Sequence, residues 1–379
     1  MDRDNSVILK KKLIIGISVS FCVCLLCIFA LRFLWLDGKN DLDKEIDVSS
    51  DNVLHDDSEI QESVDVSFDF SVEIDTSAVS SESASEEESS TVNVGEGIET
   101  LVIPEGVVLG SPNVLVYNLT EQRTIYSKIE YEICAPASLT KMLTALVALD
   151  YISIESTVKV GDEIDMIGEN SSVAFLQKGS RYKMSTMLEA LMLPSGNDAA
   201  YCLAVNAARA HANDYSLPVE EAVKDFVRLM NEKAKGLGCI SSSFLSPDGY
   251  DVDGQYTTTE DMLLISIAAH SNSYIKDCVS KSVNTQHGWY NSNMLIREDS
   301  DYYNPCVTGM KTGSTDAAGK CVAVSAEIGD KTYIMLFMKG ESSDGRYIDA
   351  NTIIDLIKEQ ANIDEPAEAE SSELSVQIQ

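Results

Sequence analysis

Three short motifs follow one another in a fixed order along the chain, separated by long stretches of sequence. They are Ser138-Leu139-Thr140-Lys141, Ser195-Gly196-Asn197 and Lys311-Thr312-Gly313. If they act together, the fold must bring together three segments that span 176 of the 379 residues. This requirement constrains the architecture more than any other feature of the sequence.

The context of the first motif distinguishes it from its copies. Ser138 follows Pro136 and opens the long apolar run from Met142 to Leu149, and a proline just before a helical pattern marks a helix start. The sequence therefore predicts a helix over 138–151, with Lys141 one turn after Ser138 and on the same face. The same S-x-x-K and S-x-N patterns occur without such context at Ser180–Lys183, Ser273–Lys276, Ser111–Asn113, Ser282–Asn284 and Ser50–Asn52.

The spacing of Ser138 and Lys141 suits nucleophilic catalysis. A serine hydroxyl is a poor nucleophile until a neighbouring base takes its proton, and a lysine three residues later on a helix can reach it. To act as the base, Lys141 must be neutral, so we expect burial and nearby positive charge to lower its pKa. The positive end of the helix favours the oxyanion that develops when a carbonyl is attacked.

Each motif also has a purely structural interpretation. Ser138–Lys141 could be an ordinary helix start with a solvated lysine, and Ser195-Gly196-Asn197 could be a simple loop, because these are common turn residues. Lys311-Thr312-Gly313 could be an edge strand ahead of a turn. An exposed edge strand is itself compatible with function, since a peptide substrate can pair with it, and Gly313 would let the substrate backbone approach closely.

Longer segments around the motifs resemble one family of penicillin-interacting serine enzymes, the D-alanyl-D-alanine carboxypeptidases, over about residues 101–360. The motif set also resembles that of class A β-lactamases. The matching segments run Ala135–Thr144 (APASLTKMLT), Leu191–Ala200 (LMLPSGNDAA), Tyr256–Asp261 (YTTTED), Asn291–Leu295 (NSNML) and Thr308–Gly319 (TGMKTGSTDAAG). The chain departs from the family at Gln255 and Ser314, where several members have histidine.

The resemblance implies a role for each motif residue. Ser138 would attack the carbonyl between the last two D-alanines of a peptidoglycan pentapeptide, with Lys141 as the base. Ser195 and Asn197 would relay protons and hold the substrate amide, and Lys311 and Thr312 would bind the terminal carboxylate. Gly313 and Ser314 complete the substrate-binding set, with the N–H groups of Ser138 and Ser314 as the oxyanion hole. β-Lactams would be covalent inhibitors, and no cofactor or metal is implied.

Rival functions remain open on the same motifs. A β-lactamase or DD-endopeptidase uses the same chemistry, but the chain lacks the E-x-x-L-N box that supplies a deacylating glutamate in class A β-lactamases. The nearest match, Glu260 to Leu264, ends in leucine. A catalytically poor β-lactam-binding envelope scaffold is the rival from another class. The histidines of the domain form no zinc-binding pattern.

The N-terminal region predicts a membrane anchor. Residues 13–31 carry no charge and follow Lys10, Lys11 and Lys12, so 1–12 should be cytoplasmic and 13–36 a transmembrane signal anchor. A cleaved signal peptide is the alternative, although no small-x-small cleavage site appears before Asp37. The expected location is the cell membrane, single-pass, with the catalytic domain outside the cytoplasm.

Acidic segments flank the catalytic domain, which we assign to 101–361. Residues 37–100 hold 20 acidic residues against Lys39 and Lys44, and 362–379 hold five acidic residues and no basic one. We expect a disordered Ser-rich linker and a disordered tail, which together account for 23 of the 33 net negative charges. Nucleic-acid binding needs basic patches, so no nucleic-acid partner is expected.

Six cysteines lie in the domain and allow 15 disulfide connectivities. Cys306 and Cys321 flank the Lys311 motif and could face each other across two strands, while six free buried thiols are the alternative.

Hydrophobic patterning predicts strands at both ends of the domain and helices between them. This indicates an α/β (α+β) fold in which an antiparallel sheet, formed by distant segments and flanked by helices, carries an inserted helical lobe, with the motifs in the groove between them. The resemblance implies the β-lactamase/DD-peptidase-like fold. Strands are expected within 107–126, with a turn at 118–121, and near 307–312, 320–328 and 331–338; helices near 185–193, 197–212, 219–237, 258–271 and 350–360; strand and loop over 158–183.

Overall fold

The computed structural model describes residues 98–362, and the predicted anchor, most of the linker and nearly all of the acidic tail lie outside that range. Within it, no helix is both long and apolar enough to cross a lipid bilayer.

One antiparallel sheet organises the domain. Its strands are β1 (Asn113–Asn118), β2 (Arg123–Lys128), β7 (Val307–Gly309), β8 (Thr312–Thr315), β9 (Gly319–Ile328) and β10 (Lys331–Gly340). They lie in the order β2-β1-β10-β9-β7, and β8 pairs with β9 beyond the end of β7. The first strand of the domain therefore pairs with the last, in a register that sets Asn113 opposite Met338, as expected for a sheet formed by distant segments.

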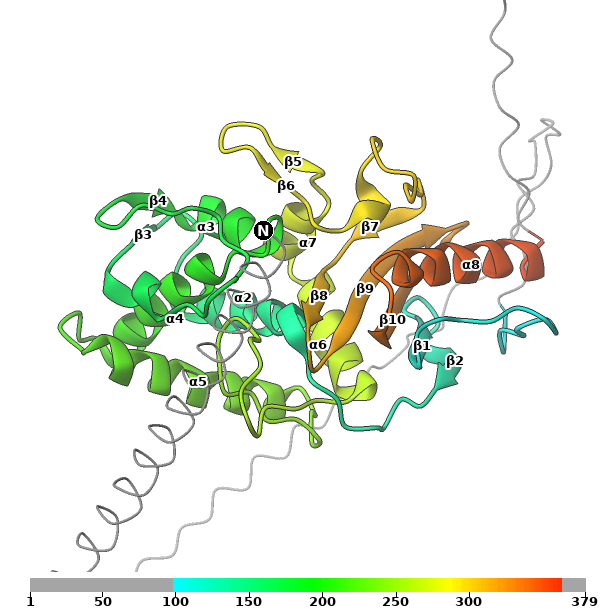
Figure 1. Cartoon of the computed structure of the whole chain (residues 1–379), viewed down its shortest axis with the longest axis horizontal. Helices are drawn as coiled ribbons and strands as arrows, with labels where there is room; N and C mark the ends of the chain where they lie inside the picture. The colour runs from blue at the N-terminus through cyan, green and yellow to red at the C-terminus, as the bar shows by residue number, and fades with distance from the viewer. Residues whose placement is uncertain (1–97, 363–379) are drawn as a thin grey trace, which may run out of the picture. The chain divides into compact units, whose positions relative to one another are not determined.

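Helices cover both faces of the sheet and form a lobe beside it (Figure 1). The helices are α2 (Thr140–Tyr151), α3 (Met184–Met192), α4 (Asn197–Ala212), α5 (Val219–Gly236), α6 (Thr259–Ser271), α7 (Ser273–Val279) and α8 (Gly345–Gln360). Short 3-10 turns are η1 (Ala137–Leu139), η2 (Asp162–Met166) and η3 (Met294–Ile296). Two small hairpins, β3 (Thr157–Lys159) with β4 (Arg181–Lys183) and β5 (Val283–Asn284) with β6 (Trp289–Tyr290), complete the elements.

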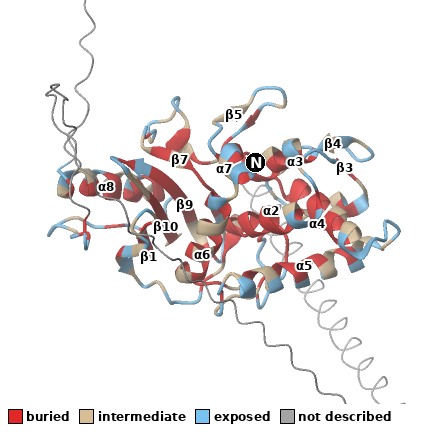
Figure 2. Cartoon of the chain, turned by 180° about the vertical axis from the view of Figure 1, so that it is seen from behind, coloured by how far each residue is buried: buried red, intermediate tan, exposed pale blue. Residues whose placement is uncertain are grey.

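The sheet separates two hydrophobic cores because successive strand residues point to opposite faces. Val114 and Val116 of β1 join the core under α8, whereas Leu115 joins the larger core shared with the helical lobe. The same alternation runs along β9 and β10. Figure 2 shows the resulting burial, with red concentrated on the sheet and on the inner sides of α2 and α4.

The predicted fold class and the predicted helices are confirmed, with differences at element ends. Ser138 lies in η1, two residues before α2 begins at Thr140, instead of in the first turn of the α-helix. The strand expected over 307–312 is split, because Met310 adopts φ 91° and Gly309 φ 143°, which interrupts the pairing with β9 between β7 and β8. The small elements α7, β5 and β6 were not predicted.

The suggested pairing of Cys306 with Cys321 is wrong. Cys306 lies opposite Glu327 at one end of β9, whereas Cys321 lies opposite Gly313 near the other end. Six residues of strand separate the two positions, roughly 20 Å, which is far beyond the reach of a disulfide. All six cysteines of the described range are free thiols.

Candidate active site

The turn that carries Ser138 joins the sheet to the helical lobe. Pro136 precedes η1, Ala137 adopts φ 48°, and Lys141 follows in the first turn of α2. The Lys141 ammonium donates a hydrogen bond to Ser138 Oγ at 2.9 Å. The contact expected from the three-residue spacing is therefore present, although it crosses from a 3-10 turn into the helix.

A neighbouring loop closes over this turn and was not identified from the sequence. Its residue Gly249 has φ +80°, and a Cβ placed there would lie 1.9 Å from the carbonyl oxygen of Ala137. Only glycine therefore fits. The carbonyl oxygen of Asp248 accepts a hydrogen bond from Lys141 Nζ at 2.7 Å. The available signal was the turn-forming run Ser246-Pro247-Asp248-Gly249.

The second motif supplies another acceptor for the same lysine. Asn197 begins α4, its Oδ1 accepts from Lys141 Nζ at 2.7 Å, and its Nδ2 donates to Ser171 Oγ at 2.9 Å. Ser195 adopts φ 62°, a strained conformation for a non-glycine residue, and its buried Oγ has no hydrogen-bond partner in residues 98–362. A buried hydroxyl without a partner at such a position is available for a substrate or a proton.

Asp198 fixes the loop that forms the wall beyond Asn197. Its buried carboxylate accepts hydrogen bonds from the backbone N–H groups of Ala174, Leu176 and Ala199. Because three donors converge on one carboxylate, the loop is held against the start of α4. Sequence reasoning matched this aspartate to the family segment without assigning it a role.

The surroundings of Lys141 act on its pKa in both directions. It is fully buried, and burial lowers the pKa of its ammonium to about 8, while the carboxylates of Asp248 and Asp198 act in the opposite direction. A lysine in this state can be neutral near physiological pH and can accept the proton of Ser138. Burial lowers the pKa of Lys141 as predicted, whereas the charged neighbours that act on it are carboxylates, which raise the pKa, instead of the predicted positive charge.

Lys311 is also fully buried, close to the cationic side chains of Lys141 and Arg346. Its Nζ donates to the carbonyl oxygen of Thr312 at 3.0 Å. Burial, followed by the charges of Lys141 and Arg346, holds the pKa of Lys311 well below its usual range. Thr312 Oγ1 and Ser292 Oγ share a hydrogen bond of 2.6 Å, which ties β8 to the N-S-N segment.

Arg346 supports β8 from behind and was missed, because the predicted last helix started only at residue 350. Its guanidinium donates to the carbonyl oxygens of Gly313 and Cys321 and to Ser314 Oγ. Nothing in the local sequence pattern distinguishes it from a surface arginine.

The open edge of β8 faces the η1 turn that carries Ser138. Lys311 and Ala323 exchange both backbone hydrogen bonds, so by the alternation of an antiparallel ladder the N–H of Ser314 points away from β9. A Cβ at Gly313 would lie 3.0 Å from Ala137 Cβ and 3.3 Å from the backbone nitrogen of Ser138. The smallest residue is thus needed where β8 meets η1.

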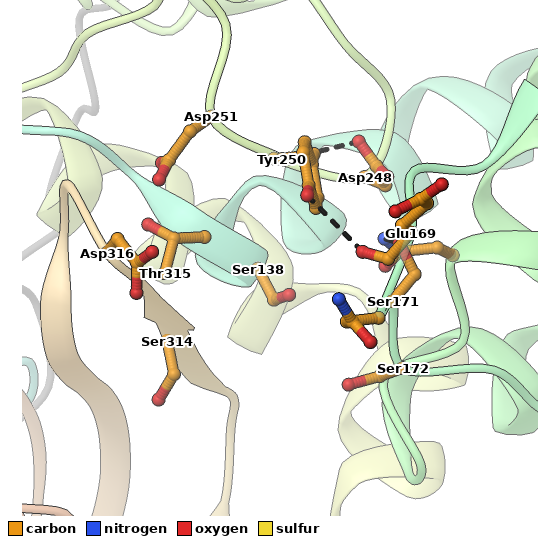
Figure 3. A pocket seen from close by; sticks show the side chains of 13 residues that line it. Ser138, Glu169, Ser171, Ser172, Asp248, Tyr250, Asp251, Ser314, Thr315 and Asp316 are labelled. Atoms are coloured by element: carbon orange, nitrogen blue, oxygen red, sulfur yellow. Dashed lines mark hydrogen bonds between the residues drawn. The ribbon is translucent and has the colours of Figure 1, made fainter. Parts of the chain in front are cut away.

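These segments enclose a pocket of about 460 Å³ (Figure 3). Of the predicted residues, Ser138, Asn197 and Ser314 line it, while Ser195, Lys141, Lys311, Thr312 and Gly313 are not among its lining residues. The rest of the lining is Glu169, Asn170, Ser171, Ser172, Asp248, Gly249, Tyr250, Asp251, Thr315 and Asp316. Within residues 98–362, no group of three or more His, Cys, Asp or Glu side chains is placed to hold a metal ion.

Comparison with known proteins places this arrangement among characterised relatives. A family profile described as D-alanyl-D-alanine carboxypeptidase, peptidase family S11, matches residues 109–342. D-alanyl-D-alanine carboxypeptidase DacF of Bacillus subtilis is 29% identical over 244 residues, covering 62% of this chain and 58% of DacF. DacA of Escherichia coli is 32% identical over 231 residues, covering 58% of this chain and 53% of DacA. The chain thus spans little more than half the length of these two relatives.

Solved structures share the fold. The Streptomyces K15 DD-transpeptidase superposes with a TM-score of 0.59 at 27% identity, covering 66% of this chain and 98% of that protein. Penicillin-binding protein D2 from Listeria monocytogenes, solved in a cefotaxime-bound form, gives a TM-score of 0.56 at 26% identity, with coverage of 67% and 99%.

Proposed function

The chain belongs to the D-alanyl-D-alanine carboxypeptidase family, and on that premise we propose that it removes the terminal D-alanine from peptidoglycan stem peptides. The observation that carries the proposal is the position of the Lys141 ammonium. It donates hydrogen bonds to Ser138 Oγ and to Asn197 Oδ1, and both of these residues line the same pocket. A buried lysine whose pKa falls to about 8 is suited to activate a serine.

The reaction proceeds through an acyl-enzyme. Lys141 takes the hydroxyl proton while Ser138 Oγ attacks the carbonyl carbon between the two D-alanines, and the N–H groups of Ser138 and Ser314 stabilise the oxyanion. The amine of the leaving D-alanine receives the proton through Lys141 and Ser195 as the peptide bond breaks. Lys311 and Thr312 hold the terminal carboxylate of the substrate. Water then attacks the ester, which releases the shortened peptide and restores the Ser138 hydroxyl.

β-Lactams should acylate the same serine. The cefotaxime-bound relative from Listeria supports this part of the proposal, because the strained lactam carbonyl would occupy the place of the scissile peptide carbonyl.

Transpeptidation is a second candidate function, favoured by one comparison. The Streptomyces K15 relative carries the name carboxypeptidase among curated proteins and DD-transpeptidase among solved structures. An acyl-enzyme can be attacked by an amine as well as by water, so the two reactions share every step up to the ester.

The test uses the purified protein and mass spectrometry. Penicillin should add its full mass covalently, and a pentapeptide ending in D-Ala-D-Ala should release one D-alanine per turnover. Addition of an amine acceptor separates the two candidates, because a transpeptidase forms the longer amide product at the expense of the hydrolysed one. A binding scaffold would form the penicillin adduct and release no D-alanine, and that outcome would refute catalysis.

We also propose that the catalytic domain works outside the cytoplasm, attached through residues 13–36. The uncharged run and the preceding lysines support this location, together with a substrate that belongs to the cell wall.

A further inference from the structure

The loop that closes over the η1 turn, residues 244–255, contacts α2 through two successive carbonyl groups. The carbonyl oxygen of Pro247 accepts a hydrogen bond from Thr144 Oγ1 at 2.6 Å, and that of Asp248 accepts from Lys141 Nζ at 2.7 Å. The two donors lie one turn apart on the helix. The conformation of this loop therefore decides where one of the three hydrogen-bond partners of Lys141 lies.

The side-chain amide of Gln255 forms hydrogen bonds to the loop on both sides of Asp248. Gln255 is 9% exposed. Its Oε1 accepts from the backbone N–H groups of Leu245 and Ser246 at 2.9 and 3.0 Å, and its Nε2 donates to the carbonyl oxygen of Tyr250 at 2.8 Å. One buried amide thus supplies partners for three backbone groups of a loop that forms neither helix nor strand.

Two further hydrogen bonds connect these anchored residues to the tip of the loop. Ser246 Oγ accepts from the backbone N–H of Gly249 at 3.1 Å, and Asp248 Oδ1 accepts from the backbone N–H of Tyr250 at 3.0 Å, the bond drawn in Figure 3. Each bond includes a residue that Gln255 holds, Ser246 in one case and Tyr250 in the other. The position of the Gln255 amide therefore helps to set the orientation of the peptide group at Asp248.

The Asp248 carbonyl in turn determines where the lone pair of a neutral Lys141 points. The ammonium has three donors, which bond Ser138 Oγ, Asn197 Oδ1 and the Asp248 carbonyl oxygen. A neutral amine keeps two N–H donors and one lone pair. Asn197 Oδ1 and the Asp248 oxygen are carbonyl oxygens that can only accept, so they take the two N–H groups. The lone pair is left facing Ser138 Oγ, and the hydroxyl proton can move to it.

We propose that Gln255 is a positioning residue for the reaction: by holding the Asp248 carbonyl against Lys141 Nζ, its side-chain amide directs the lone pair of the base at the Ser138 hydroxyl. This inference rests on the proposed function, in which Lys141 is the base. Gln255 belongs to none of the three motifs and is not among the residues that line the pocket, so it acts through Lys141 and does not contact the substrate.

Gln255→Met tests the inference, because methionine has a similar shape and forms none of the three hydrogen bonds. Stopped-flow measurements with the full-length protein and a fluorescent penicillin separate the Kd of the non-covalent complex from the acylation rate constant. At about pH 9.5, above the lysine pKa of about 8, the base is neutral, and losing an acceptor would only lower that pKa further. A difference there reports orientation. We expect the rate constant to fall at least about tenfold, with Kd within about twofold.

Asn231→Leu is the matched control. The Asn231 amide, on α5, also holds the backbone of this loop, accepting from the N–H of Phe244 at 2.9 Å and donating to its carbonyl oxygen at 2.7 Å. In the described part of the chain it forms no hydrogen bond to residues 245–250, so its acylation rate constant should match that of the unmodified protein even where its stability falls. The final amount of penicillin adduct, measured by mass spectrometry, normalises each rate to the folded fraction.

Gln255→Glu is a second variant that supplies the measurement if Gln255→Met does not fold. It keeps an acceptor for the N–H groups of Leu245 and Ser246 but loses the donor to Tyr250. The acylation rate constant should again fall at high pH, by less than in Gln255→Met.

The outcomes separate the inference from its premise. An unchanged acylation rate constant in the Gln255 variants, with or without a higher Kd, would overturn the inference and leave the proposed function standing. An equal fall in Asn231→Leu would do the same, because the effect would then follow from the stability of the loop. If the unmodified protein formed no penicillin adduct, the proposed function would be wrong and the inference with it.

Discussion

At the scale of single residues, Lys141 links the other parts of the site. Its ammonium donates hydrogen bonds to Ser138, Asn197 and the backbone carbonyl of Asp248 simultaneously, and it is fully buried. Its protonation state therefore decides whether Ser138 can be deprotonated.

Acylation should depend on pH through this lysine. Burial lowers the pKa of Lys141 from 10.5 to about 8, so the neutral base accumulates as pH rises through that value and is lost below it. The acylation rate with a fluorescent penicillin, measured between about pH 6 and 9.5, should rise roughly tenfold per unit below pH 8 and then level off. Lys141→Arg, whose side chain stays protonated, should be inactive throughout. An acylation rate that stays constant over this pH range would exclude Lys141 as the base.

Ser138→Ala should abolish both the penicillin adduct and D-alanine release. The loss of one small polar group in a 3-10 turn should change the free energy of unfolding by less than about 1 kcal/mol. Ser180→Ala and Ser273→Ala are matched controls, because these serines also begin S-x-x-K patterns yet do not line the pocket. Mass spectrometry measures the penicillin adduct on each variant. A covalent adduct on the Ser138→Ala variant would mean that another residue is the nucleophile.

Lys311→Ala should distinguish substrates by their C-terminus. If the lysine binds the terminal carboxylate, activity on a free-acid peptide should fall about ten- to a hundredfold more than activity on the corresponding C-terminal amide. Lys311 has no carboxylate partner in the described residues, so an incoming one would not compete with an existing ion pair. Steady-state kinetics on both peptides measure the difference. Equal losses would indicate instead that Lys311 acts on Lys141.

At the scale of elements, the loop over the η1 turn that carries Ser138 depends on a single glycine. Gly249→Ala would force a Cβ into the carbonyl of Ala137 at φ +80°, which should destabilise the protein by about 2–4 kcal/mol and displace the Asp248 carbonyl from Lys141. Thermal unfolding and the acylation rate are the measurements.

Gly254→Ala is the matched control for this substitution. It has φ +88°, but its Cβ would meet only Leu245 Cδ1 at an ordinary 3.5 Å, so we expect a loss of roughly 1 kcal/mol and normal acylation. If both substitutions lowered the stability and the acylation rate equally, the contact between residue 249 and Ala137 would not explain the requirement for glycine.

The elements also show where sequence reasoning succeeds and where it fails. The helix Asn197–Ala212 was predicted with its observed bounds, because an apolar pattern follows a turn motif. Residues 307–312 were predicted to form one strand, because local strand propensity does not reveal that Met310 adopts a positive φ and divides the strand. The segments that close the site, Asp248-Gly249 and Arg346, act through contacts with distant residues, and a single sequence does not encode such contacts as a pattern.

At the scale of the whole molecule, the position of the domain relative to a membrane is testable. Protease added outside intact protoplasts should cleave within the acidic segment 37–100 and release an active soluble domain, while the N-terminal residues remain protected. A protein that is already soluble, with a new N-terminus near Asp37, would identify the uncharged run as a cleaved signal peptide.

The pairing of the first strand with the last has a consequence for the order of folding. β1 is made early, but its partner β10 follows more than 200 residues later, so synthesis at 5–20 residues per second leaves roughly 10–45 s before the sheet can close. During that interval the apolar faces of β1 and of the helices lack their partner. Folding dominated by such non-local pairing is slow, and a chain truncated before β10 would lack the strand that joins β1 to β9.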